Sequence, residues 1–219
     1  WPEAVLHLLL PRACAHCRRD LPLGDRGPLC APCAAALPPA PDPGCARCGA
    51  ALGARRDFCS ACAGRLFACR LIRAACAHRG PAASLVHAFK FRGSRAAARA
   101  AGAALARAVA LRPEVSGFDA LTFVPIHPRR LRERGYNQAE IIARELAAAT
   151  GRPLLDLLER RRGAPPSWGL RRADRRRALA GAFAVRAEAA RAAAGRRVLI
   201  VDDVCASATT LEECALTLR

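Results

Sequence analysis

The sequence contains no methionine, a single lysine, few aromatic residues and no long apolar run. Aromatic residues form 5% of the chain, which argues against direct stacking of single-stranded DNA bases on its surface. No apolar run approaches the ~20 residues that a membrane-spanning helix requires. The short apolar stretch near the N-terminus follows Glu3 rather than a basic segment, so a signal peptide is not expected. These absences predict a cytoplasmic protein without a membrane span.

The sequence does contain enough apolar material for a packed core. Of its 219 residues, 53% are hydrophobic and 25% are charged, which excludes wholesale disorder. The length suits a small domain followed by a larger one. The chain begins at Trp1 and ends at Arg219 within a helical pattern, which suggests a fragment of a longer protein.

The charge is strongly basic, with 36 lysine and arginine residues against 18 acidic ones and a formal net charge of +18. Such an excess can attract polyanions, nucleic acids among them, through counterion release. However, Lys90 is the only lysine and alanine is very abundant, so a genome with GC-rich codons could produce much of the same bias. The charge alone does not decide between these explanations.

Twelve cysteines are present, and eight of them form four CxxC pairs. Two cysteines separated by two residues present both sulfurs to one metal, and two such knuckles complete the tetrahedral coordination of a structural zinc ion. We therefore predict two zinc sites, with consecutive or interleaved pairing of the knuckles, formed by Cys14, Cys17, Cys30, Cys33, Cys45, Cys48, Cys59 and Cys62. A disulfide framework is disfavoured because no export signal is present, and an iron–sulfur cluster is the minor alternative. Free buried thiols are predicted at Cys69, Cys76, Cys205 and Cys214.

A change of composition near residue 65 predicts two domains, at residues 1–65 and 66–219. The first is rich in cysteine, proline and glycine, whereas the second has regular apolar periodicity. Strands are expected at residues 68–78, 120–125 and 197–201, helices at 81–91, 95–111, from Asn137 onward and at 210–219, and basic loops at 126–136 and 160–177. Strands that alternate with helices predict an α/β fold with a parallel sheet covered on both faces.

Two adjacent aspartates, Asp202 and Asp203, follow the last predicted strand, and small or hydroxylated residues then open a helix. Ligands of open α/β sheets bind at the carboxyl ends of the strands. Backbone N–H groups at a helix N-terminus suit a phosphate, whereas carboxylates suit sugar hydroxyls. This arrangement predicts a site for a phosphorylated sugar. In the alternative interpretation, the aspartates only end a strand, and Ser207 or Thr209 caps the helix.

The order of these motifs resembles the ComF/GntX family over essentially the whole chain. The most specific block is the segment Arg-Gly-Tyr-Asn-Gln at residues 134–138. The other blocks are the cysteine knuckles, Phe-Lys-Phe-Arg-Gly at 89–93, Val-Pro-Ile-His-Pro at 124–128, and residues 170–183. Residues 198–210 are similar to the phosphoribosyl-pyrophosphate (PRPP) signature of type I phosphoribosyltransferases.

The resemblance implies a type I phosphoribosyltransferase-like parallel sheet with flanking helices, preceded by a small double zinc ribbon. It implies that Asp202 and Asp203 hold the ribose hydroxyls and that Arg134 contacts the pyrophosphate, so these three are the candidate catalytic residues. The implied PRPP-binding set is Asp202, Asp203, Ala206, Ser207, Ala208, Thr209 and Thr210. In such a site Mg²⁺ accompanies PRPP, residues 126–136 form the pyrophosphate loop and residues 160–177 cover the site. The family's last strand is not found before Arg219.

The phosphate loop departs from the family pattern. Family members usually carry a hydroxyl and a glycine where this chain has Ala206 and Ala208, and a glutamine near Ser167. Ala206 removes a hydrogen-bond donor, and Ala208 disfavours a positive φ angle. The resemblance implies a protein that binds PRPP or a related sugar phosphate and acts in DNA uptake during natural competence, and a phosphoribosyltransferase if the site is active. The alternative is an inactive zinc-ribbon adaptor that binds single-stranded DNA or competence-machinery proteins.

Overall fold

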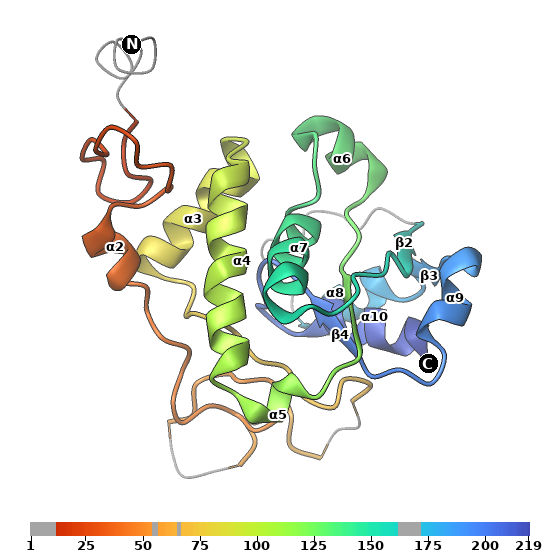
Figure 1. Ribbon diagram of the computed structural model, residues 1–219. Helices are drawn as coiled ribbons and strands as arrows, with labels where there is room; N and C mark the ends of the chain where they lie inside the picture. The colour runs from red at the N-terminus through yellow and green to blue at the C-terminus, as the bar shows by residue number, and fades with distance from the viewer. Residues whose placement is uncertain (1–11, 54–56, 65–66, 162–171) are drawn as a thin grey trace.

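The computed structural model describes residues 12–53, 57–64, 67–161 and 172–219. The described part of the cysteine-rich region contains one short helix, α2 (Ala31–Ala35), and is otherwise irregular. A mixed α/β region follows, in which helices surround a parallel sheet (Figure 1). The α/β class predicted from the sequence, with a cysteine-rich part in front of it, is confirmed.

Two helices connect the cysteine-rich region to the sheet. The first, α3 (Gly80–Phe91), is followed by α4 (Arg95–Ala110), whose N-terminus is capped by the Ser94 hydroxyl, which accepts a hydrogen bond from the Ala97 amide at 3.2 Å. Helix α4 packs closely against α7 (Gln138–Thr150), and Gly102 allows this approach. A Cβ at that position would lie 2.6 Å from Glu145 Cβ, which no side chain could accept without a shift of one helix.

The central sheet consists of β1 (Ala120–Phe123) and β4 (Val198–Val201), which pair in parallel. An isolated parallel bridge between Leu121 and Leu154 extends the sheet beyond β1. All of β1 is buried, because α7 packs on one face of the sheet, with α4 against α7, and α10 (Thr209–Leu218) packs on the other. These strands and helices lie where the apolar patterns predicted them.

A second, antiparallel sheet is formed by β2 (Leu158–Arg160) and β3 (Phe183–Val185). Helix α8 (Arg172–Leu179) precedes β3 and α9 (Ala187–Ala193) follows it, while α5 (Pro113–Ser116) leads into β1. Helix α10 contacts α8, β3 and β4, so it packs against both sheets. The sequence patterns did not predict β2, β3 or α9.

The strand expected at residues 68–78 is wrong. This segment is irregular, and its backbone groups are bonded elsewhere: the Glu212 carboxylate accepts from the Ala68 and Cys69 amides at 2.8 and 3.1 Å, and the Arg47 carbonyl accepts from the Ile72 amide at 2.6 Å. These bonds leave no continuous ladder for a neighbouring strand.

The two basic loops were also predicted incompletely. Residues 126–136 contain a helix, α6 (Pro128–Arg134), with a proline in its first turn and the His127 ring accepting from the Arg129 amide at 3.2 Å. In the stretch 160–177, residues 162–171, with Ser167 among them, lie outside the described residues. The part that follows begins α8 rather than continuing a loop.

The predicted domain boundary coincides with residues 65 and 66, which lie outside the described residues, so the division into residues 1–65 and 66–219 stays a prediction. Within the described ranges, none of the helices combines the length and apolarity that a membrane crossing requires.

Candidate functional site

The first group of four cysteines, which we call the first ribbon (residues 14–33), brings its sulfurs within 4.8 Å of one another. Its members are Cys14, Cys17, Cys30 and Cys33. Cys17 Sγ lies 3.7 Å from Cys30 Sγ, and the Cys30 amide donates to Cys14 Sγ at 3.4 Å. A zinc ion bound tetrahedrally at about 2.3 Å from each sulfur requires sulfurs about 3.8 Å apart. The donor set and its spacing fit zinc.

The second ribbon (residues 45–62) repeats this geometry. Its ligands are Cys45, Cys48, Cys59 and Cys62, again within 4.8 Å of one another. The Cys48–Cys59 sulfur distance is 3.7 Å, and the Cys59 amide donates to Cys45 Sγ at 3.4 Å. The knuckles are therefore paired consecutively, which the sequence had left open. Two four-cysteine sites of this kind are consistent with two structural zinc ions.

The electrostatics of the two ribbons favour a cation among the sulfurs. Burial raises the pKa of Cys14, but amide hydrogen bonds from Cys30, Cys17 and His16 outweigh it and bring that pKa to about 6. Cys45 reaches about 6 by the same balance. In contrast, burial and neighbouring sulfurs raise the pKa of Cys33 to about 12. Four thiolates can coexist at such a site only when a metal ion compensates their charge.

All twelve cysteines are free of disulfide bonds. Of the four outside the ribbons, Cys214 is buried and Cys69 and Cys76 are half-buried, and burial raises the pKa of each of these three thiols. Cys205 is exposed, which corrects the expectation that all four thiols would be buried. It lies in the turn after β4, where small residues bring the chain to the surface.

The turn after β4 carries the two aspartates and leads into α10. The Asp203 amide donates to Asp202 Oδ1 at 2.8 Å. Ala208 precedes the helix in a left-handed conformation, with φ at +61°, and the Ser207 and Thr209 hydroxyls lie 3.0 Å apart. Among the described residues, no group accepts a hydrogen bond from the amides of residues 206–208. These amides and the first amides of α10 are thus available to an anion.

Three cationic side chains from separate elements lie near the aspartates. Lys90, at the end of α3, places Nζ 3.1 Å from Asp203 Oδ1. Burial and the charge of Arg130 lower the pKa of Arg134, at the end of α6, and the charge of Asp203 offsets part of this shift. Arg160, on β2, places its Cζ 5.5 Å from the centroid of the Phe183 ring. Burial lowers the pKa of Arg160, and the charge of Asp202 opposes this shift. The charge of Asp203 thus acts on Arg134, whose guanidinium itself donates to Gln138 Oε1 at 3.3 Å.

Asp202 differs electrostatically from its neighbour. Its pKa is raised to about 7, first by burial and then by the negative charge of Asp203. Asp203 instead faces the ammonium group of Lys90. The two adjacent carboxylates consequently have separate environments.

The segment at residues 134–138 explains how the site is held together. Gly135 ends α6 in a left-handed conformation, and the Tyr136 hydroxyl donates to the Phe89 carbonyl at 2.6 Å. Asn137 caps α7 by accepting from the Ala139 amide at 3.1 Å, and its side-chain amide donates to the Val124 carbonyl at 3.0 Å. The Gln138 side chain also donates to the Phe89 carbonyl and accepts from Arg134. This block therefore fixes the ends of α3, β1, α6 and α7.

Two residues of this cluster were missed by sequence reasoning. Lys90 carried a signal, because a single lysine among arginines stands in a specific block of the sequence. Arg160 belonged to the stretch expected to cover the site, but nothing in its local sequence distinguished it from the other arginines there or predicted the short strand β2.

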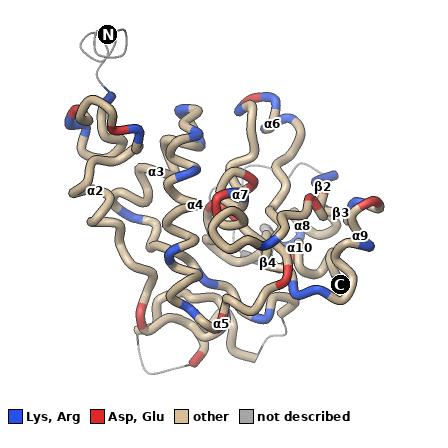
Figure 2. The backbone as a smooth tube through the Cα atoms, in the orientation of Figure 1, with Lys and Arg blue, Asp and Glu red and all other residues tan. Residues whose placement is uncertain are grey.

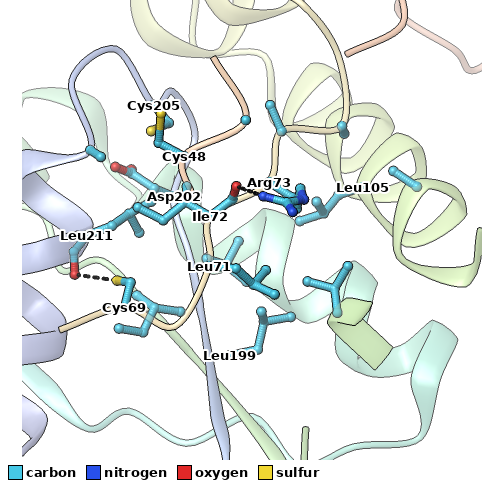
Figure 3. Close-up of a pocket in the computed structure, with 18 of the residues that line it drawn as sticks. Cys48, Cys69, Leu71, Ile72, Arg73, Leu105, Leu199, Asp202, Cys205 and Leu211 are labelled. Atoms are coloured by element: carbon cyan, nitrogen blue, oxygen red, sulfur yellow. Dashed lines mark hydrogen bonds between the residues drawn. The ribbon is translucent and has the colours of Figure 1, made fainter. Parts of the chain in front are cut away.

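A cavity of about 1160 Å³ borders the turn after β4. Its walls come from β4, α4, the segment 68–78 and the second ribbon, and most of them are apolar. Figure 3 shows Asp202, Cys205 and Cys48 around the same part of it, with Ile72 and Leu199 along the wall. The acidic pair thus has a polar loop on one side and an apolar space on the other.

Comparison with known proteins agrees with this architecture. The family model described as "Double zinc ribbon domain" matches residues 5–63. Competence protein F of Haemophilus influenzae (strain ATCC 51907 / DSM 11121 / KW20 / Rd) is 29% identical over 211 residues, which cover 94% of this chain and 90% of that protein. Together these matches support a ComF family assignment. No solved structure matches the chain.

The two cysteine groups account for the double zinc ribbon that the family model describes. Both groups fall within the matched residues, and each offers a complete set of four sulfurs. The roles assigned to Asp202, Asp203 and Arg134, and to the loop that follows the aspartates, stay predictions.

Proposed function

We propose that the chain binds PRPP or a related phosphorylated ribose at the turn between β4 and α10, and that it acts in a competence-related process. The competence role is suggested by the name of the Haemophilus influenzae relative, Competence protein F, which aligns with most of the chain. The ligand is suggested by the chemistry of the turn itself.

One observation carries the ligand proposal. At the carboxyl end of β4, two carboxylates precede a turn that opens a ten-residue helix. Among the described residues, the amides of residues 206–208 in this turn have no hydrogen-bond acceptor. Carboxylates accept hydrogen bonds from sugar hydroxyls, whereas free amides at a helix N-terminus suit a phosphate. Parallel α/β sheets bind their ligands at this end of the strands. Ribose and its 5′-phosphate satisfy both requirements together.

The arginines of α6 favour a ligand with a second anionic group. Arg130 and Arg134 lie on α6, beyond the carboxyl end of β1, and the charge of Asp203 acts on Arg134. A pyrophosphate on the ribose would be neutralised by such arginines and by the Mg²⁺ that it carries. In phosphoribosyl transfer these groups would hold the departing pyrophosphate while positive charge develops on the ribose.

Binding is a stronger expectation than transfer. Ala208 adopts the positive φ that glycine favours, so the turn keeps the required backbone shape at some conformational cost. Ala206 offers no hydroxyl to a phosphate. These features support a site that retains its sugar-phosphate geometry with reduced affinity.

The second candidate function is that of an adaptor for single-stranded DNA or for proteins of the competence machinery. It is favoured by the charge of +18 and by exposed arginines on the first ribbon, α4 and α6. Figure 2 shows basic residues at the upper end of α4 and on α6, on the same side of the molecule. Such a surface would bind a phosphate backbone mainly through electrostatics.

Calorimetric titration of the zinc-loaded protein separates these functions. Mg-PRPP should bind, and Asp203→Asn should weaken it about tenfold or more, because hydroxyl donors would face an amide in place of a carboxylate. Glu188→Gln, which removes one exposed carboxylate on α9, is the matched control and should bind like the parent. If oligo(dT) binds and Mg-PRPP does not, the adaptor function replaces the proposal.

A further inference from the structure

Lys90 and Asp203 form an ion pair that differs from the surface pairs of this chain. The Nζ–Oδ1 distance is 3.1 Å, and the two side chains are 23% and 13% exposed. By contrast, the Arg129–Glu133 pair on α6 is 78% and 52% exposed. Water competes weakly for an enclosed pair, so its geometry is better defined than that of a surface pair.

The backbone that carries Lys90 is fixed by residues from outside α3. The Phe89 carbonyl, at the C-terminal end of α3, accepts hydrogen bonds from the Tyr136 hydroxyl at 2.6 Å and from the Gln138 side chain at 3.4 Å. The Ala88 carbonyl accepts from the Arg92 and Ser94 amides. With the helix end satisfied in this way, the position of Lys90 is set by the fold rather than by its own pairing.

Asp203 depends on Lys90 more than Asp202 does. Asp202 accepts a hydrogen bond from the Asp203 amide, so its carboxylate is tied to the backbone. The carboxylate of Asp203 has Lys90 as its charged partner. Without that cation, the Asp203 carboxylate would lose its charged partner and could turn away from the loop.

We propose that Lys90 is the positioning residue for Asp203, holding one carboxylate oxygen so that the other is presented to the ribose hydroxyls of the ligand. This inference rests on the proposed function, since it concerns the same site. Lys90 contacts Oδ1 of Asp203, and in this proposal Oδ2 of the same carboxylate accepts from a ligand hydroxyl. Lys90 then acts on affinity through Asp203 and not through a contact of its own with the ligand.

A double-mutant cycle measured by titration with Mg-PRPP tests this role. Lys90→Met should weaken binding about tenfold in the parent, because it frees and destabilises the Asp203 carboxylate. The same substitution in the Asp203→Asn background should change affinity by less than about twofold. Lys90→Arg, which restores a cation, should remain within about threefold of the parent. Arg144→Met, which breaks an exposed pair on α7, is the charge-matched control and should have no effect.

The outcomes separate the proposal from its alternatives. If Lys90→Met costs as much in the Asp203→Asn background as in the parent, Lys90 contacts the ligand directly and the positioning role is wrong. If the parent does not bind Mg-PRPP at all, the proposed function itself fails. Thermal unfolding and zinc content of each variant show whether it is folded.

The single lysine provides a second test that requires no substitution of Lys90. Because Lys90 is the only source of an ε-amine, acetylation by an N-hydroxysuccinimide ester can be followed at this residue by mass spectrometry. Asp203→Asn should raise the labelling rate at Lys90 about tenfold, since the amine loses its partner. Equal rates in the two proteins would show that the pair does not form in solution and would overturn the proposal.

Discussion

The two ribbons have almost the same metal geometry but are attached to the molecule in different ways. In each, a sulfur–sulfur distance is 3.7 Å and an amide–sulfur bond is 3.4 Å. Cys14 and Cys33 of the first ribbon belong to the same apolar cluster as Leu85 and Phe89 of α3. Among the described residues, the cysteines of the second ribbon belong to neither apolar cluster.

The second ribbon is held mainly through backbone contacts with the segment 68–78. The Ile72 amide donates to the Arg47 carbonyl, and the Arg73 guanidinium donates to the Cys45 carbonyl at 3.5 Å. Figure 1 shows the first ribbon beside α3 and the second below α4 and α5. The same ligand pattern therefore has a different structural role in each ribbon. We expect the first zinc to stabilise the core, and the second to shape the cavity next to the acidic pair.

The largest effect is expected when the first ribbon loses its metal. Cys14→Ser removes one ligand, and the packing of Leu21 and Leu29 on the core would be lost with it. The free energy of unfolding should fall by roughly 3 kcal/mol or more, since ligation energy is folding energy here. Thermal unfolding followed by circular dichroism, with zinc content near one per chain, checks this. An unchanged transition would mean that the first ribbon does not contribute to the core.

The second ribbon should be lost with less effect on the rest of the chain. Cys45→Ser should also leave one zinc per chain. The free energy of unfolding of the rest of the chain should fall by only about 1 kcal/mol, because the ribbon opens locally. Comparison of the two serine variants in one experiment is the control for the substitution itself. If both variants lower the free energy of unfolding equally, the two ribbons belong to one cooperative unit and do not differ in their contribution to the core.

The raised pKa of Asp202 predicts a pH dependence that the second ribbon should modulate. In the folded chain this carboxyl keeps its proton up to a pKa of about 7, whereas in the unfolded chain it ionises near its ordinary value of about 4. Between these values the unfolded state binds fewer protons, so the free energy of unfolding falls as pH rises. The expected fall, on the order of 1 kcal/mol or more, should be absent in Asp202→Asn.

The fall in the free energy of unfolding between pH 5 and pH 7 should be smaller in Cys45→Ser than in the parent. The second ribbon and Asp202 line one cavity, and loss of the ribbon would admit water to the carboxyl. Urea unfolding at pH 5, 6 and 7 measures the dependence in all three proteins. An equal slope in the parent and in Asp202→Asn would show that the carboxyl titrates normally.

The smallest effect is expected at Ala208. Glycine pays no penalty for the left-handed conformation of this residue, so Ala208→Gly should raise stability slightly or leave it unchanged, within about 1 kcal/mol. It should also tighten Mg-PRPP, because the backbone can approach a phosphate more closely. Differential scanning calorimetry with and without Mg-PRPP measures both. Weaker binding by the glycine variant would argue that the methyl group of Ala208 contributes to the site.

Local patterns predicted much of this molecule. The ribbon ligands follow from spacing within the CxxC pairs, and strands β1 and β4 from short apolar runs. The cap of α7 follows from Asn137, whose side chain accepts from a nearby amide. In each of these cases, the residues that determine the structure are neighbours in the sequence.

The features that were missed depend on partners far away in the chain. The segment 68–78 has the composition of a strand, but Glu212 and Arg47 bind its backbone. The pair of Lys90 and Asp203 joins α3 to the turn after β4. Helix α6 lacks an apolar stripe, and its short length is set by Pro128 and Gly135 at its ends. Tertiary contacts of this kind leave little trace in local periodicity.

Hydrogen–deuterium exchange with and without Mg-PRPP tests the central claim most directly, because it locates the ligand on the backbone. A sugar phosphate bound at this turn should slow exchange in residues 202–210, where the amides of residues 206–208 have no acceptor among the described residues, with a smaller effect in residues 126–134. The two ribbons and α9 should exchange as before. Protection confined to the arginines of α4 and α6, with residues 202–210 unchanged, would contradict the sugar-phosphate site and point to general electrostatic binding of the anion.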